Sequence, residues 1–256
     1  MPWTIAQAQI FFLVFVRVLG IIMTAPVLGT SLYPSMVRVG LAVALAGLLA
    51  PMQEVPAEAV SAATLAMSTT LETLTGLLIG FTSSLIFYAL QMGVSFLGLQ
   101  SGFRGASGVN PALAQIMGQQ GSSLETIYTL LIPLVFLIID GHHWLIAGMQ
   151  RSFEVVAIGQ LNLGPVVLER LIEMSGLLFR TALVFAFPIL CTLLLVDLAL
   201  AIVARAVPQI QVFFVGLPLK MGLSMVAVVI ALPWMVSTMG ARLSDVAFDM
   251  LVLILP

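Results

Sequence analysis

The stretch RAVPQIQVFFVGLPLK, from Arg205 to Lys220, separates two long apolar segments in the second half of the chain. It has a basic residue at each end, with prolines, glutamines and a glycine between them. Three interpretations are open: a cytoplasmic loop between two membrane spans, a broken helix inside a transport path, or an ordinary loop. The choice depends on the character of the segments that flank it.

The composition places the whole chain in an apolar environment. Of its 256 residues, 61% are hydrophobic and only 8% are charged, whereas soluble domains carry about 25% charged and 45–50% apolar residues. A soluble fold could not remove so much apolar surface from water. The net charge of −2 gives no basic stripe for nucleic acid. We therefore predict an all-α integral membrane protein.

Six apolar stretches have the composition of membrane helices. A spanning helix needs about 20 residues, so the second stretch is too short to span alone. The fifth is too long for an upright span and contains Pro188, which predicts a tilt or kink. We expect about six long hydrophobic helices, kinked and packed as hairpins: Gln9–Leu28, Val39–Pro51, Leu71–Leu99, Leu124–Met149, Leu171–Ala204 and Val212–Met239.

Basic residues between the apolar stretches predict a topology. The positive-inside rule places the loops that contain Arg38, Arg104 and Arg205–Lys220 on the cytoplasmic side, with both termini outside. Arg151 and Arg242 fall on the opposite side, so the bias is weak. A weak bias favours a chain that is held in place by partner proteins rather than by the bilayer.

A glycine-rich segment between the third and fourth stretches does not fit a membrane helix. GVSFLGLQSGFRGASGVNPALAQIMGQQGSS, residues 93–123, holds seven of the 21 glycines. Irregular backbone cannot face lipid at membrane depth, because its polar groups would have no partners there. The segment is either a flexible loop in water or an ordered loop packed in a cavity, and its apolar side chains leave both open.

The sequence DGHHWL, which begins at Asp140, offers metal-ligand residue types. His142 and His143 are adjacent, however, and adjacent residues on a helix point about 100° apart. Metal-binding helices use i, i+3 or i, i+4 spacing instead. A polar cap or turn at a helix end is therefore favoured over a metal site, and we expect no cofactor.

Several ionisable residues lie in or near the apolar stretches, which in a membrane protein is a functional signal. They could bind ions in a transporter or form charge pairs between helices or subunits. Arg180 and Asp197 are too far apart on one helix to pair with each other. No inverted repeat is visible, so the charge-pair interpretation is favoured for the set Arg17, Glu72, Asp140, His142, Arg180 and Asp197.

Motifs for catalysis are missing, and a helix-packing motif is present. The sequence contains no H-E-x-x-H, no G-x-S-x-G and no usefully spaced carboxylate pair, so we do not expect an enzyme. Gly76 and Gly80 form a G-x-x-x-G pattern, which predicts close contact with a neighbouring helix.

Four of these segments together resemble the FliR family of flagellar export-gate proteins. RAVPQIQVFFVGLPLK is similar to its P-x-I-N-x-F-x-x-G-x-P-x-K signature, with Gln211 in place of Asn. DGHHWLIAGMQRSF resembles G-G-H-H followed by S-F, with Asp140 in place of the first Gly. RVLGIIMTAPVLG resembles the R-x-x-G…P opening, and LQSGFRGASGVNP the glycine-rich loop, with Asn110–Pro111 in place of Asp-Pro.

The resemblance implies a non-enzymatic subunit of a protein-conducting channel. Its partners would be FliP and FliQ in a hetero-oligomeric gate, with FlhB, other export-apparatus membrane proteins and unfolded export substrates. Its place would be the bacterial inner membrane at the flagellar basal body, with the gate projecting towards the periplasm. The same family includes SctT of virulence type III secretion, which stays an alternative. A small-solute secondary transporter is a second alternative.

The resemblance also implies a division of the chain. Residues 1–164 would form a FliP-like helical part, which includes the glycine-rich loop at about 93–123, and residues 165–256 a FliQ-like hairpin. The loop would act as a pore plug through Arg104, Gly105, Gly108, Val109, Asn110, Pro111, Ile116, Met117 and Gly118. The cytoplasmic-side bend of the hairpin would comprise Arg205, Pro208, Gln209, Gln211, Phe213, Gly216, Pro218 and Lys220.

Overall fold

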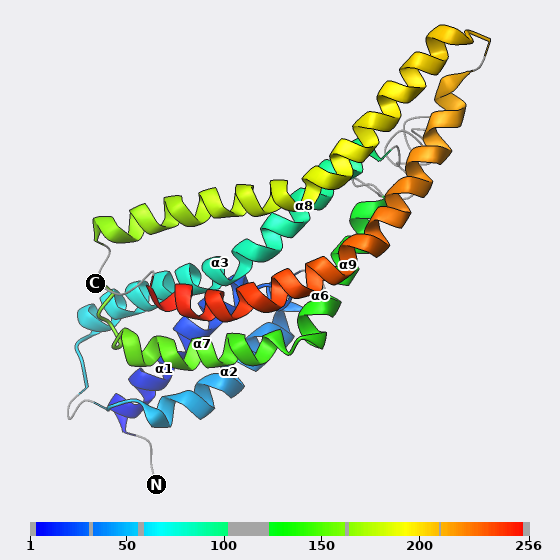
Figure 1. Ribbon diagram of the computed structural model, residues 1–256. Helices are drawn as coiled ribbons and strands as arrows, with labels where there is room; N and C mark the ends of the chain where they lie inside the picture. The colour runs from blue at the N-terminus through cyan, green and yellow to red at the C-terminus, as the bar shows by residue number, and fades with distance from the viewer. Residues whose placement is uncertain are drawn as a thin grey trace. The chain divides into compact units, whose positions relative to one another are not determined.

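The computed structural model describes residues 4–30, 33–55, 59–101, 123–161, 164–209 and 211–252. All regular secondary structure in these ranges is helical (Figure 1), which confirms the predicted all-α class. In chain order the elements are α1 (Ile5–Thr24), α2 (Ser35–Leu49), the 3-10 turn η1 (Ala50–Met52), α3 (Ala62–Gln100), α6 (Ser123–Ile138), α7 (Gly141–Val155), α8 (Pro165–Ala206) and α9 (Val212–Val252).

The chain folds into two compact units. The first comprises residues 1–85, 140–175 and 241–256, and the second comprises residues 86–139 and 176–240. The long helices α3, α8 and α9 therefore each contribute one part to each unit.

Helix α1 forms the centre of the first unit. It begins with a capping box, in which Thr4 Oγ1 accepts the Gln7 backbone N–H and Gln7 Oε1 accepts the Thr4 backbone N–H, so two N-terminal donors are satisfied. Its residues Val14, Val18 and Ile21 are fully buried. Side chains from α2, α3, α7 and the start of α8 join them in one hydrophobic cluster.

The crossing of α1 and α3 is made by small residues. A Cβ atom added to Gly20 would lie 3.2 Å from the backbone of Gly76. One added to Gly76 would overlap the Arg17 carbonyl oxygen, and one added to Gly80 would overlap Thr24 Oγ1. The two backbones touch because no Cβ stands between them, so the contact predicted from the G-x-x-x-G pattern is confirmed.

Helix α2 presents a narrow stripe of alanines to the core and leaves its other faces exposed. Ala42, Ala46 and Ala50 are buried at four-residue intervals, which places them on one face. The helix starts at Ser35 and continues through η1 to Met52, giving 18 residues with the apolarity of a membrane span. The prediction that this stretch is too short to span was therefore wrong, because the helix begins before Arg38.

The fourth predicted stretch is two helices rather than one. Helix α6 ends at Ile138 and α7 starts at Gly141, with Asp140 between them in the left-handed conformation at φ 56°. Aspartate adopts this conformation more readily than most residues because its short polar side chain can bond locally. The break therefore occurs where a polar residue and a glycine interrupt the apolar run.

The second unit is organised around a helical hairpin and the side chain of Phe185. In Figure 1 the adjoining parts of α8 and α9 run side by side up to the end of α8 at Ala206 and the start of α9 at Val212. The Phe185 ring stacks on Trp234 of α9 at 5.5 Å and meets Tyr128 of α6 edge-on at 5.9 Å. On α3, Gly93 leaves room for the same ring. One aromatic residue thus joins four helices.

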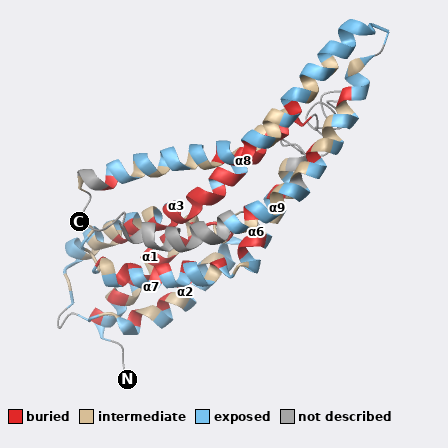
Figure 2. Ribbon diagram, in the orientation of Figure 1, coloured by how far each residue is buried: buried red, intermediate tan, exposed pale blue. Residues whose placement is uncertain are grey.

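Five described helices are long and apolar enough to cross a membrane, and α6 with α7 would make a sixth if the broken pair counts as one span. In the hairpin helices α8 and α9, only 17% and 12% of the residues in the most apolar windows are buried, against 17% in the window of α2. Figure 2 shows exposed residues over most of this hairpin. Its apolar surface must be covered by lipid or by other chains.

Candidate functional site

The bend of the α8–α9 hairpin is shorter than the sequence predicted. Helix α8 ends at Ala206 and α9 resumes at Val212, so Pro208, Gln209 and Gln211 lie in the connection. The other residues assigned to the bend belong to the helices: Arg205 to the last turn of α8, and Phe213, Gly216, Pro218 and Lys220 to α9. Helix α9 continues through Pro218 because membrane-type helices tolerate the lost hydrogen bond.

An ion pair joins α8 and α9 about two helical turns after the start of α9. Lys220 Nζ pairs with Asp197 Oδ1 of α8, and Gln100 Nε2 at the end of α3 donates to Asp197 Oδ2 at 2.8 Å. The side chains are 18% exposed for Lys220 and 33% exposed for Asp197. Asp197 thus has its partner on another segment, as predicted, and the cluster fixes three helices to one another.

Beyond this pair the hairpin exposes a cluster of large apolar side chains. Phe213 and Phe214 are 58% and 66% exposed, and their rings meet nearly at right angles 5.7 Å apart. Val215 beside them is also exposed. Gly216 faces inward, where a Cβ would lie 2.9 Å from Leu200 Cδ1. The tip is therefore closely packed inside and aromatic outside, as a docking surface for an apolar partner would be.

In the first unit, the buried charge Arg17 is satisfied by three separate segments. Its guanidinium holds Glu72 of α3 in a two-pronged pair, with Nε–Oε2 at 2.5 Å and Nη2–Oε1 at 2.9 Å. Nη1 donates to the carbonyl oxygens of Ser152 and Val156 at the end of α7, each at 3.0 Å. The Phe153 ring lies 4.3 Å from the guanidinium carbon, within cation–π range.

Glu72 extends this hydrogen-bond network to the turn that follows α7. Its Oε1 also accepts the backbone N–H of Gly159 at 2.7 Å. Gly159 has φ +78°, a conformation that side chains with a Cβ rarely adopt, and an added Cβ would lie 2.9 Å from Ser68 Oγ. The carboxylate and guanidinium are 1% and 0% exposed. A buried pair of this kind requires such complete hydrogen bonding, and it holds α1, α3 and α7 together.

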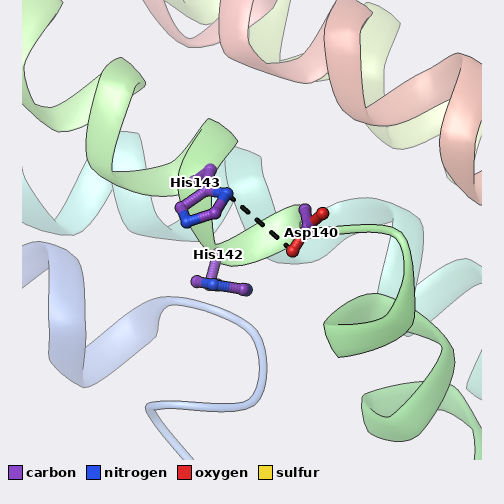
Figure 3. Close-up of side chains that lie close together, drawn as sticks. All are labelled: Asp140, His142 and His143. Carbon is purple, nitrogen blue, oxygen red and sulfur yellow. Dashed lines mark ion pairs between the residues drawn. The ribbon is translucent and has the colours of Figure 1, made fainter.

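Asp140, His142 and His143 lie close together at the start of α7 (Figure 3), with their potential ligand atoms all within 4.8 Å of one another. The expectation that the adjacent histidines diverge was thus only partly right. His143 Nδ1 lies 3.8 Å from Asp140 Oδ1, and both side chains are 69% exposed. These groups stand at a helix N-terminus, whose positive dipole end disfavours a cation. The helix begins here with the His143 backbone N–H donating to the Asp140 carbonyl oxygen at 2.9 Å, and the Asp140 side chain makes no capping hydrogen bond.

Arg180 was predicted to form a charge pair, but it lies apart from the other charged residues of the predicted set. It is exposed on α8, and it has no ion-pair partner among the described side chains. It does not pair with Asp197, and this agrees with the prediction that the two residues are too far apart on one helix. The plug residues from Arg104 to Gly118 and Ile210 of the hairpin signature lie outside the described residues.

Some residues of these networks gave no signal in the sequence. Gln100, the carbonyl oxygens of Ser152 and Val156, and the N–H of Gly159 act through tertiary contacts that no local pattern encodes. The one usable signal was charge: few ionisable residues occur in the apolar helices, so each needs a partner of opposite charge. That reasoning applies to the pairs Arg17–Glu72 and Asp197–Lys220. Within the described residues these arrangements neutralise charge and present no activated nucleophile.

Comparison with known proteins matches nearly the entire chain. The profile of the family described as "Bacterial export proteins, family 1" matches residues 8–246. The flagellar biosynthetic protein FliR of Escherichia coli K12 is 32% identical, covering 88% of this chain and 85% of that protein. FliR of Bacillus subtilis 168 is 32% identical, covering 87% and 85%. FliR of Aquifex aeolicus VF5 is 28% identical, covering 90% and 88%. The chain therefore belongs to the FliR family of bacterial export proteins.

Proposed function

We propose that this chain is a subunit of the flagellar type III protein export gate, in which it forms and closes the protein-conducting channel together with FliP and FliQ chains. The observation that carries the proposal is the match to the export family over residues 8–246. Relatives named as flagellar biosynthetic proteins align over most of their own length, so the whole chain, rather than one motif, supports the assignment.

The exposed apolar surface of the long helices favours a chain that packs against other proteins over a chain that functions alone. Helix α8 has 42 residues and α9 has 41, which at 1.5 Å per residue is roughly 60 Å. A bilayer core of about 30 Å covers only half of that length. Apolar residues such as Leu168 and Ile202, near opposite ends of α8, are 64% and 70% exposed. Other protein helices covering the remainder would account for these lengths.

The proposed partners follow from the division of the chain. A FliP-like part at residues 1–164 and a FliQ-like hairpin at residues 165–256 would each pack against copies of the corresponding subunit. The exposed Phe213–Phe214 tip is suited to a contact with FlhB at the cytoplasmic entrance. In this arrangement the chain resides in the inner membrane at the flagellar basal body, with the gate raised towards the periplasm.

The glycine-rich segment at about residues 93–123 is proposed as the plug that closes the channel. Its composition supports this role, since glycine gives a deformable backbone and apolar side chains exclude water and ions from a constriction. Deletion within Gly105–Gly118 is expected to raise the ion conductance of membranes that contain the assembled gate. Unchanged conductance with an intact assembly would refute the plug.

The equivalent SctT subunit of a virulence secretion system is the alternative, and the flagellar names of the relatives reported above favour the flagellar system. A small-solute transporter is less well supported. Such a protein would keep charges free for ions, whereas Arg17, Glu72, Asp197 and Lys220 are paired within the chain.

Secretion in a strain that lacks this gene tests the proposal. We expect flagellar hook and filament proteins to remain inside the cells, and plasmid-borne expression of the chain to restore them to the medium. Normal flagellar secretion combined with loss of virulence-type secretion would assign the chain to the alternative system. Normal secretion by both routes would refute an export role.

A further inference from the structure

Arg38 in α2 carries a charge that this chain compensates poorly. Its side chain is only partly exposed, and its Nε atom is buried without a hydrogen-bond partner. Nη1 makes two contacts, with Met23 Sδ at 3.6 Å and with the Gly29 carbonyl oxygen at 3.5 Å. Among the described side chains no carboxylate pairs with it. Arg38 therefore lacks the pairing that a partly buried guanidinium requires.

Arg17 in the same unit shows how complete such compensation can be. Its guanidinium pairs with the Glu72 carboxylate and donates to two carbonyl oxygens, each at 3.0 Å. For Arg38, by contrast, the thioether sulfur is a weak acceptor, and 3.5 Å lies beyond the usual range of a hydrogen bond. Because the Arg38 side chain stays partly exposed, a carboxylate from another chain can supply what its own chain does not.

A row of large apolar side chains continues from Arg38 along α2 and into η1. Leu41 is 36% exposed, Leu48 is 70% exposed and Met52 is 63% exposed, whereas Leu45 packs partly against the core. Alternating intervals of three and four residues place all of them on one side of the helix. We call this row the α2 seam, and it comprises Arg38, Leu41, Leu45, Leu48 and Met52.

The spacing and the charge of the α2 seam favour a protein helix as its partner. Side chains at alternating intervals of three and four residues interlock with those of a second helix, whereas hydrocarbon chains require no particular spacing. An arginine at one end of the row adds a polar requirement, which a carboxylate meets with paired, charge-assisted hydrogen bonds. Only 17% of the residues in the apolar window of α2 are buried, so the chain's own helices leave the seam available.

We propose that the α2 seam docks an apolar helix of a neighbouring subunit, and that an aspartate or glutamate of this helix pairs with Arg38. Because the neighbouring subunit is one of that assembly, the docking rests on the proposed export gate. The leucine and methionine side chains supply the contact area. The Arg38 pair fixes the register of the two helices, as a single polar residue does in other helical seams.

Two pairs of variants measure the contribution of the seam to assembly with coexpressed FliP and FliQ. Arg38→Gln leaves the partner carboxylate without its counter-charge, so the share of the chain recovered in the complex should fall by about tenfold or more, whereas Arg38→Lys should retain most of it. Leu48→Glu should cause a similar loss. Met36→Glu is its matched control, because Met36 is 86% exposed on the opposite side of α2, and it should change recovery by no more than about twofold. Full assembly with Arg38→Gln, or equal losses for Leu48→Glu and Met36→Glu, would overturn the proposal.

Carbodiimide cross-linking of the same complex tests the charge pair directly, because the reagent joins an amine to a carboxylate that it contacts. Lys220 is the only lysine of the chain, and its pair with Asp197 provides an internal positive control. Arg38→Lys places a second amine in the seam. We expect mass spectrometry to identify a new link from position 38 to an aspartate or glutamate of another subunit, beside the link between Lys220 and Asp197.

The outcomes of the cross-linking separate the docking from the gate itself. The Lys220–Asp197 link without a link from position 38 to another subunit would overturn the docking and leave the export gate unaffected. A link from position 38 to a carboxylate of this same chain would also overturn it. An anionic phospholipid that copurifies with the wild-type complex and is lost with Arg38→Gln, without a protein link, would assign the cation to a lipid headgroup instead. Failure of the wild-type subunits to copurify would refute the proposed function, and the docking with it.

Discussion

At the scale of single residues, Arg17 shows how a charge is accommodated inside an apolar helical unit. Its guanidinium is fully buried, yet each side of it faces a carboxylate, a carbonyl oxygen or an aromatic ring. Taking two charges out of water costs several kcal/mol per ion, and only such complete pairing offsets the cost. The arginine of the R-x-x-G motif therefore acts in folding by joining α1, α3 and α7.

Removing one member of this pair should be more damaging than removing both. Arg17→Met leaves the Glu72 carboxylate buried without a counter-charge, and we expect a loss of about 3–5 kcal/mol in the free energy of unfolding. Arg17→Met combined with Glu72→Met should recover most of it. Thermal unfolding in detergent measures both.

The matched control is Arg151→Met, because Arg151 pairs with Glu154 on the surface, where the side chains are 64% and 51% exposed. An exposed pair of this kind contributes only about 0.2–1 kcal/mol. Equal destabilisation by Arg17→Met and Arg151→Met would show that the buried network has no special role.

At the scale of helices, the hydropathy of the sequence predicted where the apolar elements lie but not where they end. The break at Asp140 depends on a single left-handed residue, and the bend at Pro208 is narrow because α9 tolerates Pro218. Hydropathy is averaged over many residues, so it does not reveal a break or a bend that depends on one or two residues. The Gly76–Gly80 contact could be predicted, because small residues spaced by four leave a recognisable pattern, whereas its partner Gly20 required the structure.

The α1–α3 crossing should depend on the absence of a single methyl group. Gly76→Ala would force the helices apart, because its Cβ would overlap the Arg17 carbonyl oxygen, and overpacking of this kind costs about 1–3 kcal/mol. Gly40→Ala in α2 meets nothing within 4 Å and should stabilise by roughly 0.5–1 kcal/mol, since alanine favours helix. Shifts of the melting temperature in opposite directions are the expected result, and a matching decrease in both variants would contradict the close crossing.

The hairpin depends on the pairing of Asp197 with Lys220. Lys220→Glu places two carboxylates together and should lower both thermal stability and the export of flagellar proteins. Exchanging the charges, with Asp197→Lys and Lys220→Asp in one chain, should restore part of both. Arg205→Glu is the control, because Arg205 has no ion-pair partner among the described residues and lies in the last turn of α8. If the exchange is as defective as Lys220→Glu alone, the pair does not hold the hairpin closed.

At the scale of the whole molecule, the distribution of apolar surface connects the fold with the function. The first unit has a conventional core around α1, whereas most of the α8–α9 hairpin is exposed. The composition already predicted a membrane protein, because 61% hydrophobic residues exceed what a soluble fold can bury. It could not distinguish surface that faces lipid from surface that faces other subunits, since both are equally apolar. Under the proposed function, other subunits cover most of it.

The central claim is that this chain is one subunit of a hetero-oligomeric export gate. The most direct test is the mass of the intact particle that copurifies with the tagged chain in mild detergent, after expression together with its FliP and FliQ partners. We predict a single stable complex that contains this chain and several copies of both partners, and no particle of that mass when the partners are omitted. A stable monomer or homodimer of 27.3 kDa chains, unchanged by the presence of the partners, would contradict the account.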